Sequence, residues 1–271
     1  MTHNTPCTPT PREIILALLR AAETWVSGQA VSQRLGISRA AVGKHITALR
    51  NEGHAIEAST RKGYKLLATQ DTLCGEALAA SLATRVFGKT GLTVLRTTAS
   101  TNLDAAHLAE EGVGEGHVVV AEMQTKGRGR KGHEWFSAPR SLQFSVLLYP
   151  QASSWDAEAF TRMAALAVAK ALCEDAGVEA VFAMPNDVFI QGKKVAGVLV
   201  ETGYRGGEPE WAVVGVGCNV NALPEEFPES VRGRSTSVLA ASGKPASRDM
   251  LLKSILEKLE TAYETLRGNT P

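Results

Sequence analysis

The stretch 127-GRGRKG-132 contains the residue types that point most directly to chemistry. Arg128 and Arg130 alternate with two glycines, which is typical of a flexible loop that brings guanidinium groups and backbone amides against an anion. Strand patterns lie on both sides, and Trp135 follows as an apolar anchor. These neighbours favour an ordered lid over a substrate, although the loop alone fits the basic tip of a surface hairpin equally well.

The same stretch matches the glycine spacing of a dinucleotide-binding fingerprint. That fingerprint needs its third glycine to begin a helix whose N-terminus holds a pyrophosphate. Here the third glycine, Gly132, precedes a segment that contains Pro139 and has no helical period. We therefore reject a dinucleotide site.

Other polar groups interrupt apolar runs further along the chain. Asn186 and Asp187 follow a proline between two strand-like segments. Gly215 and Gly217 end another strand pattern, where the backbone can approach a ligand closely and Asn219 can hydrogen-bond across a turn. A structural bulge explains the glycine stretch equally well when it is considered alone.

A helix is expected to begin within 97-TTASTNLDAAHLAEEG-112. Thr101 stands three residues before Asp104, which is the spacing of a capping box. By itself this pattern indicates only a helix N-terminus.

The elements that must position these groups are preceded by a helix-turn-helix pattern. A first helix is expected after Pro11, and a short second helix ends at Leu35 before a turn at Gly36. Ser38 is the expected N-cap of a third helix that ends at Gly53.

The third helix and the hairpin after it favour DNA binding. Helical spacing turns one apolar face inward and leaves small or basic residues outward, namely Arg39, Ala40, Lys44, Thr47 and Asn51. Two short strands follow around a tip that contains Arg61 and Lys62, where phosphates would lie. The pattern indicates a winged helix-turn-helix; a small module that binds protein or dimerises is the alternative.

Length and charge agree with two domains, 1–68 and 69–271. The 271 residues carry a net charge of only +1, yet residues 1–68 hold nine basic and four acidic side chains. A basic small domain joined to a mildly acidic larger one favours nucleic acid as the partner of the first.

Several function classes are not indicated. The sequence shows neither an apolar run of the ~20 residues that span a bilayer nor a signal peptide, so we expect a soluble, cytoplasmic protein without a membrane partner. The four cysteines are scattered without CxxC spacing and predict neither a zinc site nor a disulfide framework.

Taken in order, the motifs resemble those of one family. They are STN (100–102), Gln124, GRGR (127–130), PND (185–187), GKKVAGVLVE (192–201) and GVGCNVN (215–221) behind a winged helix. This set resembles the biotin protein ligase family in the bifunctional form that also represses transcription. The resemblance extends from about Ile14 to Leu266.

The resemblance implies an α+β protein whose larger domain has the class II synthetase-like mixed sheet. It implies that biotin and ATP, with Mg²⁺, give biotinyl-adenylate, and that a lysine of a biotin carboxyl carrier protein then accepts the biotinyl group. It further implies that filling the site promotes a homodimer, which binds a paired operator.

Site residues are implied position by position. Those with catalytic roles are Arg128, Arg130, Asn186 and Asp187. Those that bind biotin or nucleotide are Ser100, Thr101, Asn102, Gln124, Gly127, Gly129, Trp135, Lys194, Gly197, Gly215, Gly217 and Asn219. No residue is assigned to a metal.

Four departures from the family pattern reduce charge or closure around the reaction centre. Ala183 stands where the family usually has lysine, His133 and Glu134 replace an arginine and a lysine, and Gln143 replaces an aromatic residue. The last helix is followed only by "NTP", where a small β-barrel would normally continue, so we expect this barrel to be absent.

Two hypotheses follow, an active ligase that also represses and a DNA-binding sensor that has lost most turnover. A lipoate-attaching relative fits less well, because such enzymes do not combine the GRGR loop with a winged helix.

Overall fold

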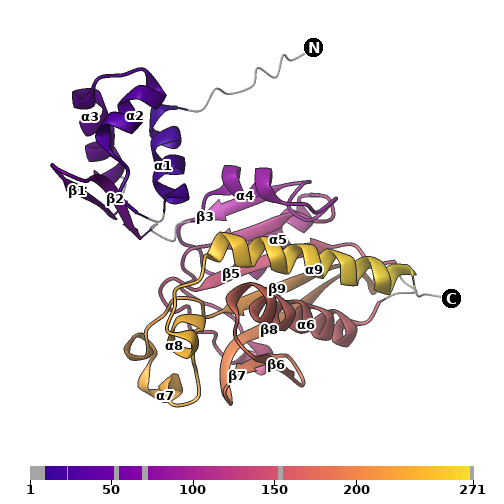
Figure 1. Cartoon of the computed structure of the whole chain (residues 1–271). Coiled ribbons are helices and arrows are strands. Elements are labelled where there is room, and N and C mark those ends of the chain that lie inside the picture. The colour runs from indigo at the N-terminus through magenta and orange to yellow at the C-terminus, as the bar shows by residue number, and fades with distance from the viewer. Residues whose placement is uncertain (1–9, 23, 52–54, 69–72, 152–154, 269–271) are drawn as a thin grey trace, which may run out of the picture. The chain divides into compact units, whose positions relative to one another are not determined.

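The computed structural model describes residues 10–22, 24–51, 55–68, 73–151 and 155–268. The chain divides into two compact units, residues 1–72 and 73–271, and Figure 1 shows the elements of each. Among the described residues, no helix is both long and apolar enough to cross a membrane.

The N-terminal unit is a winged helix-turn-helix. Its elements are α1 (Pro11–Ala21), α2 (Gly28–Leu35), α3 (Arg39–Asn51) and the antiparallel strands β1 (Ala55–Ser59) and β2 (Gly63–Ala68). The apolar faces meet in one core of Ile15, Leu19, Val31, Val42, Ile46, Leu49 and Ile56. The inward face predicted for the third helix is therefore confirmed.

Local chemistry fixes the turns of this unit. Ser27 caps α2 by accepting a hydrogen bond from Ala30 N, and Gly36 ends that helix with φ 64°. The wing is joined to the helices because the backbones of Val26 and Tyr64 exchange two hydrogen bonds of 2.8 Å.

The second unit is built on a mixed sheet, as the resemblance implied. In the described residues it has seven strands in the order β3-β4-β5-β9-β8-β7-β6. Their bounds are β3 Leu92–Leu95, β4 Val118–Ala121, β5 Leu142–Leu148, β6 Ala180–Ala183, β7 Asp187–Ile190, β8 Lys193–Arg205 and β9 Glu208–Cys218. β3 and β4 run parallel, and every other neighbouring pair is antiparallel.

Helices cover the two faces of this sheet unequally. The helices are α4 (Gly75–Ser81), α5 (Thr101–Glu110), α6 (Ala157–Ala176), α7 (Glu229–Arg232), α8 (Val238–Ser242) and α9 (Arg248–Gly268). α6 and α9 run side by side (Figure 1) and pack their apolar side chains with the sheet in the main core. α5 packs against Val119, Leu147 and Val213 on the opposite face and leaves the rest of that face for a cavity.

Helix α9 also holds the start of the sheet. The buried Arg248 forms a 2.6 Å ion pair with Glu122, just after β4. The Glu260 carboxylate accepts hydrogen bonds from the backbone N–H groups of residues 85, 86 and 87 at 2.7–2.8 Å. Two distant segments thereby depend on one helix.

Candidate functional site

A single cross-strand row contributes Gly217, Gly197 and Asp187 to the cavity wall. Register places side by side Ala121, Gln143, Gly217, Gly197, Asp187 and Ala183, one from each of six adjacent strands. The two glycines at its centre leave room for the indole of Trp135, since a Cβ on Gly217 would overlap this ring. Close approach was predicted at Gly215 and Gly217, and the protein's own side chains make it, Asn102 at Gly215 and Trp135 at Gly217.

The cavity has a volume of about 490 Å³ and gathers most of the expected residues. In the part of the chain that the structure describes, it is lined by fifteen of the sixteen expected biotin, nucleotide and catalytic residues. The exception is Gly127, which is buried and whose carbonyl accepts a hydrogen bond from Trp135 N at 2.9 Å. Gly127 therefore holds the base of the loop rather than the cavity wall.

The loop that follows Gly127 is an ordered hairpin. Gly129 N donates to the His133 carbonyl at 2.7 Å, and His133 N donates to the Arg130 carbonyl at 3.1 Å. Lys131 (φ 55°) and Gly132 (φ 76°) take left-handed conformations at the tip. The hairpin predicted as one alternative is therefore present, and its residues Arg128, Gly129, Arg130 and His133 line the cavity, whereas Lys131 and Gly132 at the tip do not.

One end of the cavity, which we call the amide end, is lined by Thr101, Asn102 and Gln124. Ser145 and Glu201 belong to this end because they are bonded to these residues from behind. Gln124 Oε1 accepts from Thr101 N at 2.8 Å and from its hydroxyl at 3.1 Å. Ser145 Oγ lies 2.8 Å from Thr101 Oγ1 and 2.7 Å from Asn102 Oδ1. Asn102 Nδ2 donates to Glu201 at 2.8 Å. The polar groups of this end are therefore already bonded to one another.

The predicted capping box at this end is wrong. Ser100 is the N-cap of α5 and makes no side-chain capping bond. Thr101 is instead the first helical residue, and its hydroxyl is bonded to Gln124 and Ser145. Asp104 accepts a hydrogen bond from the Thr98 hydroxyl at 2.6 Å.

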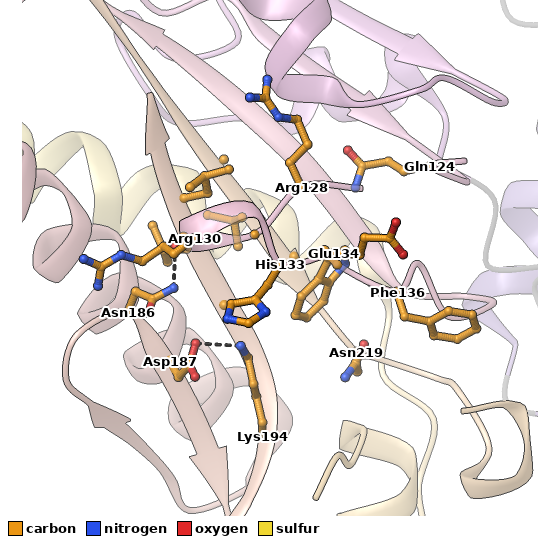
Figure 2. Close-up of a pocket in the computed structure, with 18 of the residues that line it drawn as sticks. Gln124, Arg128, Arg130, His133, Glu134, Phe136, Asn186, Asp187, Lys194 and Asn219 are labelled. Atoms are coloured by element: carbon orange, nitrogen blue, oxygen red, sulfur yellow. Dashed lines mark hydrogen bonds and ion pairs between the residues drawn. The ribbon is translucent and has the colours of Figure 1, made fainter. Parts of the chain in front are cut away.

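The opposite end, which we call the cationic end, contains Arg130, His133, Asn186, Asp187 and Lys194 (Figure 2). Lys194 Nζ forms a 2.7 Å ion pair with Asp187. Asn186 Nδ2 donates to the Val198 carbonyl at 2.8 Å, and the Val198 N–H returns a bond to the Asn186 carbonyl. The Asn-Asp pair thus fastens the turn to β8 and orients a lysine.

Arg128 connects to the amide end, whereas Arg130 does not. Arg128 forms a 2.9 Å ion pair with Glu201. Figure 2 shows the two side chains leaving the loop in different directions, with Arg130 beside Asn186. Within the described residues, no ion pair involves Arg130.

Buried polar groups without a hydrogen-bond partner lie in the cross-strand row and against it. Both amide atoms of Gln143, and Trp135 Nε1, are buried and make no hydrogen bond within the described part of the chain. An unsatisfied buried polar group costs ~1–3 kcal/mol, so this arrangement is unusual for a purely structural core.

Sequence reasoning missed two members of the amide end, Ser145 and Glu201. Ser145 is a fully buried hydroxyl within the otherwise apolar part of β5, and that interruption was the available signal. Glu201 gave a weaker signal, since an acid near the exposed part of a long strand is commonly solvated.

Cysteine chemistry is not part of this site. Among the described residues Cys74, Cys173 and Cys218 are free thiols; Cys7 lies outside them. Burial raises the pKa of the Cys218 thiol to about 12, so it is not a thiolate at neutral pH.

The expected DNA-contacting side chains are all exposed in the N-terminal unit. They are Arg39, Ala40, Lys44 and Thr47 on α3, and Arg61 and Lys62 at the wing tip. Lys62 Nζ lies 5.6 Å from the centre of the Trp25 ring. The side chain of Asn51 lies outside those that the structure describes.

Two family matches give the class of this protein, which is that of biotin and lipoate ligases that carry a DNA-binding domain. Residues 93–219 match the biotin/lipoate A/B protein ligase family, and residues 12–65 match an HTH domain.

Comparison with individual proteins shows which members of this class the chain resembles. The bifunctional ligase/repressor BirA of Bacillus subtilis is 35% identical over 263 residues, which cover 96% of this chain and 81% of that protein. The Escherichia coli protein of the same name is 29% identical and covers 92% and 75%. The biotin protein ligase of Aquifex aeolicus in complex with biotin and ATP superposes with a TM-score of 0.58 at 33% identity, covering 66% of this chain and 72% of that one. The chain therefore belongs to the biotin protein ligase family, in its bifunctional ligase/repressor form.

Proposed function

We propose that this protein forms biotinyl-5'-AMP from biotin and ATP, transfers the biotinyl group to a carrier-protein lysine, and represses transcription in response to the same ligand. One observation carries the proposal: a single cavity gathers the residues that the family motifs assign to biotin and nucleotide. The alternative of a sensor without turnover is less favoured, because Arg128, Arg130 and Lys194 still line that cavity.

The first step brings two anions into contact. A biotin carboxylate oxygen attacks the α-phosphorus of ATP, the bond to the β-phosphate oxygen breaks, and pyrophosphate leaves with the electron pair. Fixed cations lower the barrier because charge accumulates where they already point. Lys194, held by Asp187, and Arg130 are the cations placed for this task.

The second step needs a neutral amine. The lysine nitrogen of the carrier attacks the acyl carbon, AMP leaves, and the amine loses a proton. We assign biotin to the amide end and to Asn219, and the nucleotide to Asn186 and Asp187.

Mg²⁺ belongs to this proposal as a companion of ATP. Mg²⁺ in nucleotide sites is commonly held by one or two carboxylates together with substrate phosphates. It would neutralise phosphate charge when bound.

Repression requires DNA contacts and, for a paired operator, two copies of the chain. We propose a ligand-promoted homodimer in the cytoplasm that presents two α3 helices to the operator. Replacing Lys62 with Ala should weaken DNA binding and reduce the salt dependence by about one phosphate's share. An unchanged salt slope would count against wing contact.

Biotin-dependent exchange of labelled pyrophosphate into ATP tests the enzymatic part. Exchange that requires biotin supports adenylation. Tight biotin binding without exchange, in protein that is folded and binds ATP, would instead support the sensor.

A further inference from the structure

A second cavity of about 240 Å³ opens beside the first. Its walls are Arg130, Ala157, Glu158, Thr161, Arg162, Phe182, Met184, Pro185, Leu199 and Val200. The two cavities share Arg130 and Leu199. The second cavity therefore adjoins the first at the cationic end.

The gap exists because the sheet is incomplete at this point. β7 begins at Asp187, opposite Gly197, so Leu199 and Val200 of β8 pair only with β9 in the described sheet. The turn at 184–185 and the first turns of α6 border the opening. Met184, 80% exposed, stands at its rim.

Two arginine side chains line this cavity. Arg130 comes from the GRGR loop and Arg162 from α6, and within the described residues neither forms an ion pair. Glu158 also lines the cavity, four residues before Arg162, yet no ion pair joins them. Elsewhere on the same helix Lys170 and Glu174 do pair at this spacing. The cavity therefore has positive charge available for an external anion.

Other donors near the cavity are already used. Asp156 accepts hydrogen bonds from the N–H groups of Glu158 and Ala159, so it occupies the N-terminus of α6. The Thr161 hydroxyl donates to the Ala157 carbonyl at 2.7 Å. An anion in this cavity would rest on the two arginines.

We propose that Arg162, together with Arg130, binds the pyrophosphate portion of ATP and the pyrophosphate that leaves it. This inference rests on the proposed adenylation. The α-phosphate then stays in the first cavity beside Lys194, while the β- and γ-phosphates pass Arg130 into the second. The electron pair released on the bridging oxygen develops between two guanidinium groups, which favours its departure.

The test is Arg162→Gln, compared with wild type in biotin-dependent pyrophosphate exchange. Because hydrogen bonds to charged groups are worth more than neutral ones and Arg162 is exposed, the KM values for pyrophosphate and ATP should rise roughly tenfold. The KM for biotin should not change. Arg162→Lys keeps the charge and should restore part of the loss.

Lys170→Gln is the matched control, since it removes one exposed cation from the same helix away from the cavity. It should leave every KM value unchanged. Adding Ala183→Lys places a new ammonium near the end of β6 and should rescue Arg162→Gln more than it improves wild type, because the two cations would serve the same anion.

Direct titration with inorganic pyrophosphate tests the anion site separately from the adenylation reaction. If wild type does not exchange but binds pyrophosphate more tightly than Arg162→Gln, adenylation is wrong and the anion site stands. If wild type exchanges, and Arg162→Gln matches it in KM and in pyrophosphate affinity, the anion site is wrong.

Discussion

At the amide end of the cavity, hydroxyl, amide and carboxylate groups bond one another, whereas at the cationic end Arg130 and Arg162 have no ion-pair partner among the described residues. A group that is already bonded keeps its geometry without ligand. A charge without a partner gains most when an anion arrives. The two ends therefore suit different tasks, one the recognition of a neutral ring and the other the handling of phosphate.

This contrast also separates stability from activity. Each hydrogen bond at the amide end contributes ~1 kcal/mol to folding as well as to ligand geometry. The Lys194–Asp187 pair is about one-third to one-quarter exposed and contributes less to folding. Substitutions at the two ends should thus differ in which property they change.

The largest effect is expected from Lys194→Met at the cationic end. Removing a preorganised cation should slow biotinyl-adenylate formation by about 10²–10³ while changing the unfolding free energy by less than ~1 kcal/mol. Single-turnover kinetics and urea unfolding measure the two quantities. A large loss of stability in Lys194→Met would contradict the claim that the cationic end contributes to activity more than to folding.

Thr101→Val tests the amide end. The change keeps the shape but removes the hydroxyl that contacts Gln124 and Ser145, so biotin affinity should fall about tenfold and stability by ~1 kcal/mol. Calorimetric titration with biotin and thermal unfolding of the free protein give both values. An unchanged biotin affinity would contradict the assignment of this end.

Ala183→Lys should increase the difference between the two ends, because it adds a positive charge at the cationic end. Adenylation should become roughly tenfold faster, and more so together with His133→Arg, because one more donor faces the reacting groups. Biotin affinity, measured separately, should stay the same. Wild type that already matches the variant would show that the existing cations suffice.

The smallest effect concerns Gln143, which is paired with Gly217 in the cross-strand row. Gln143→Leu removes an amide without hydrogen-bond partners in the described structure and should stabilise the free protein by ~1 kcal/mol. Differential scanning calorimetry measures this gain. Destabilisation would mean that a bound water satisfies the amide.

Sequence reasoning located most of the cavity through the family resemblance, whose motifs each lie within a short stretch of the chain. It did not show that Ala121, Gln143 and Gly217 share a row with Ala183, since register between distant strands leaves no periodic signal in one chain. The capping box failed for a related reason, because the Thr101 hydroxyl is bonded to residues 23 and 44 positions away.

Arg162 is a charged residue whose role the sequence alone did not indicate. By the periodic pattern of α6 it is an ordinary solvent-facing residue. Its place in a cavity depends on the turn after β6, which forms another wall of that cavity. Positions that act through such long-range contacts become visible once the sheet is assembled.

Glu260 on α9 carries a consequence for synthesis on the ribosome. The backbone N–H groups of residues 85–87, which precede the first strand of the sheet, donate hydrogen bonds to a carboxylate that is translated more than 170 residues later. The core of the winged helix, by contrast, lies within the first 72 residues. During translation the DNA-binding unit can therefore fold before α9 has been synthesised, whereas the biotin-binding unit cannot complete its fold until then. For a time the nascent chain has a folded DNA-binding unit but no folded biotin site.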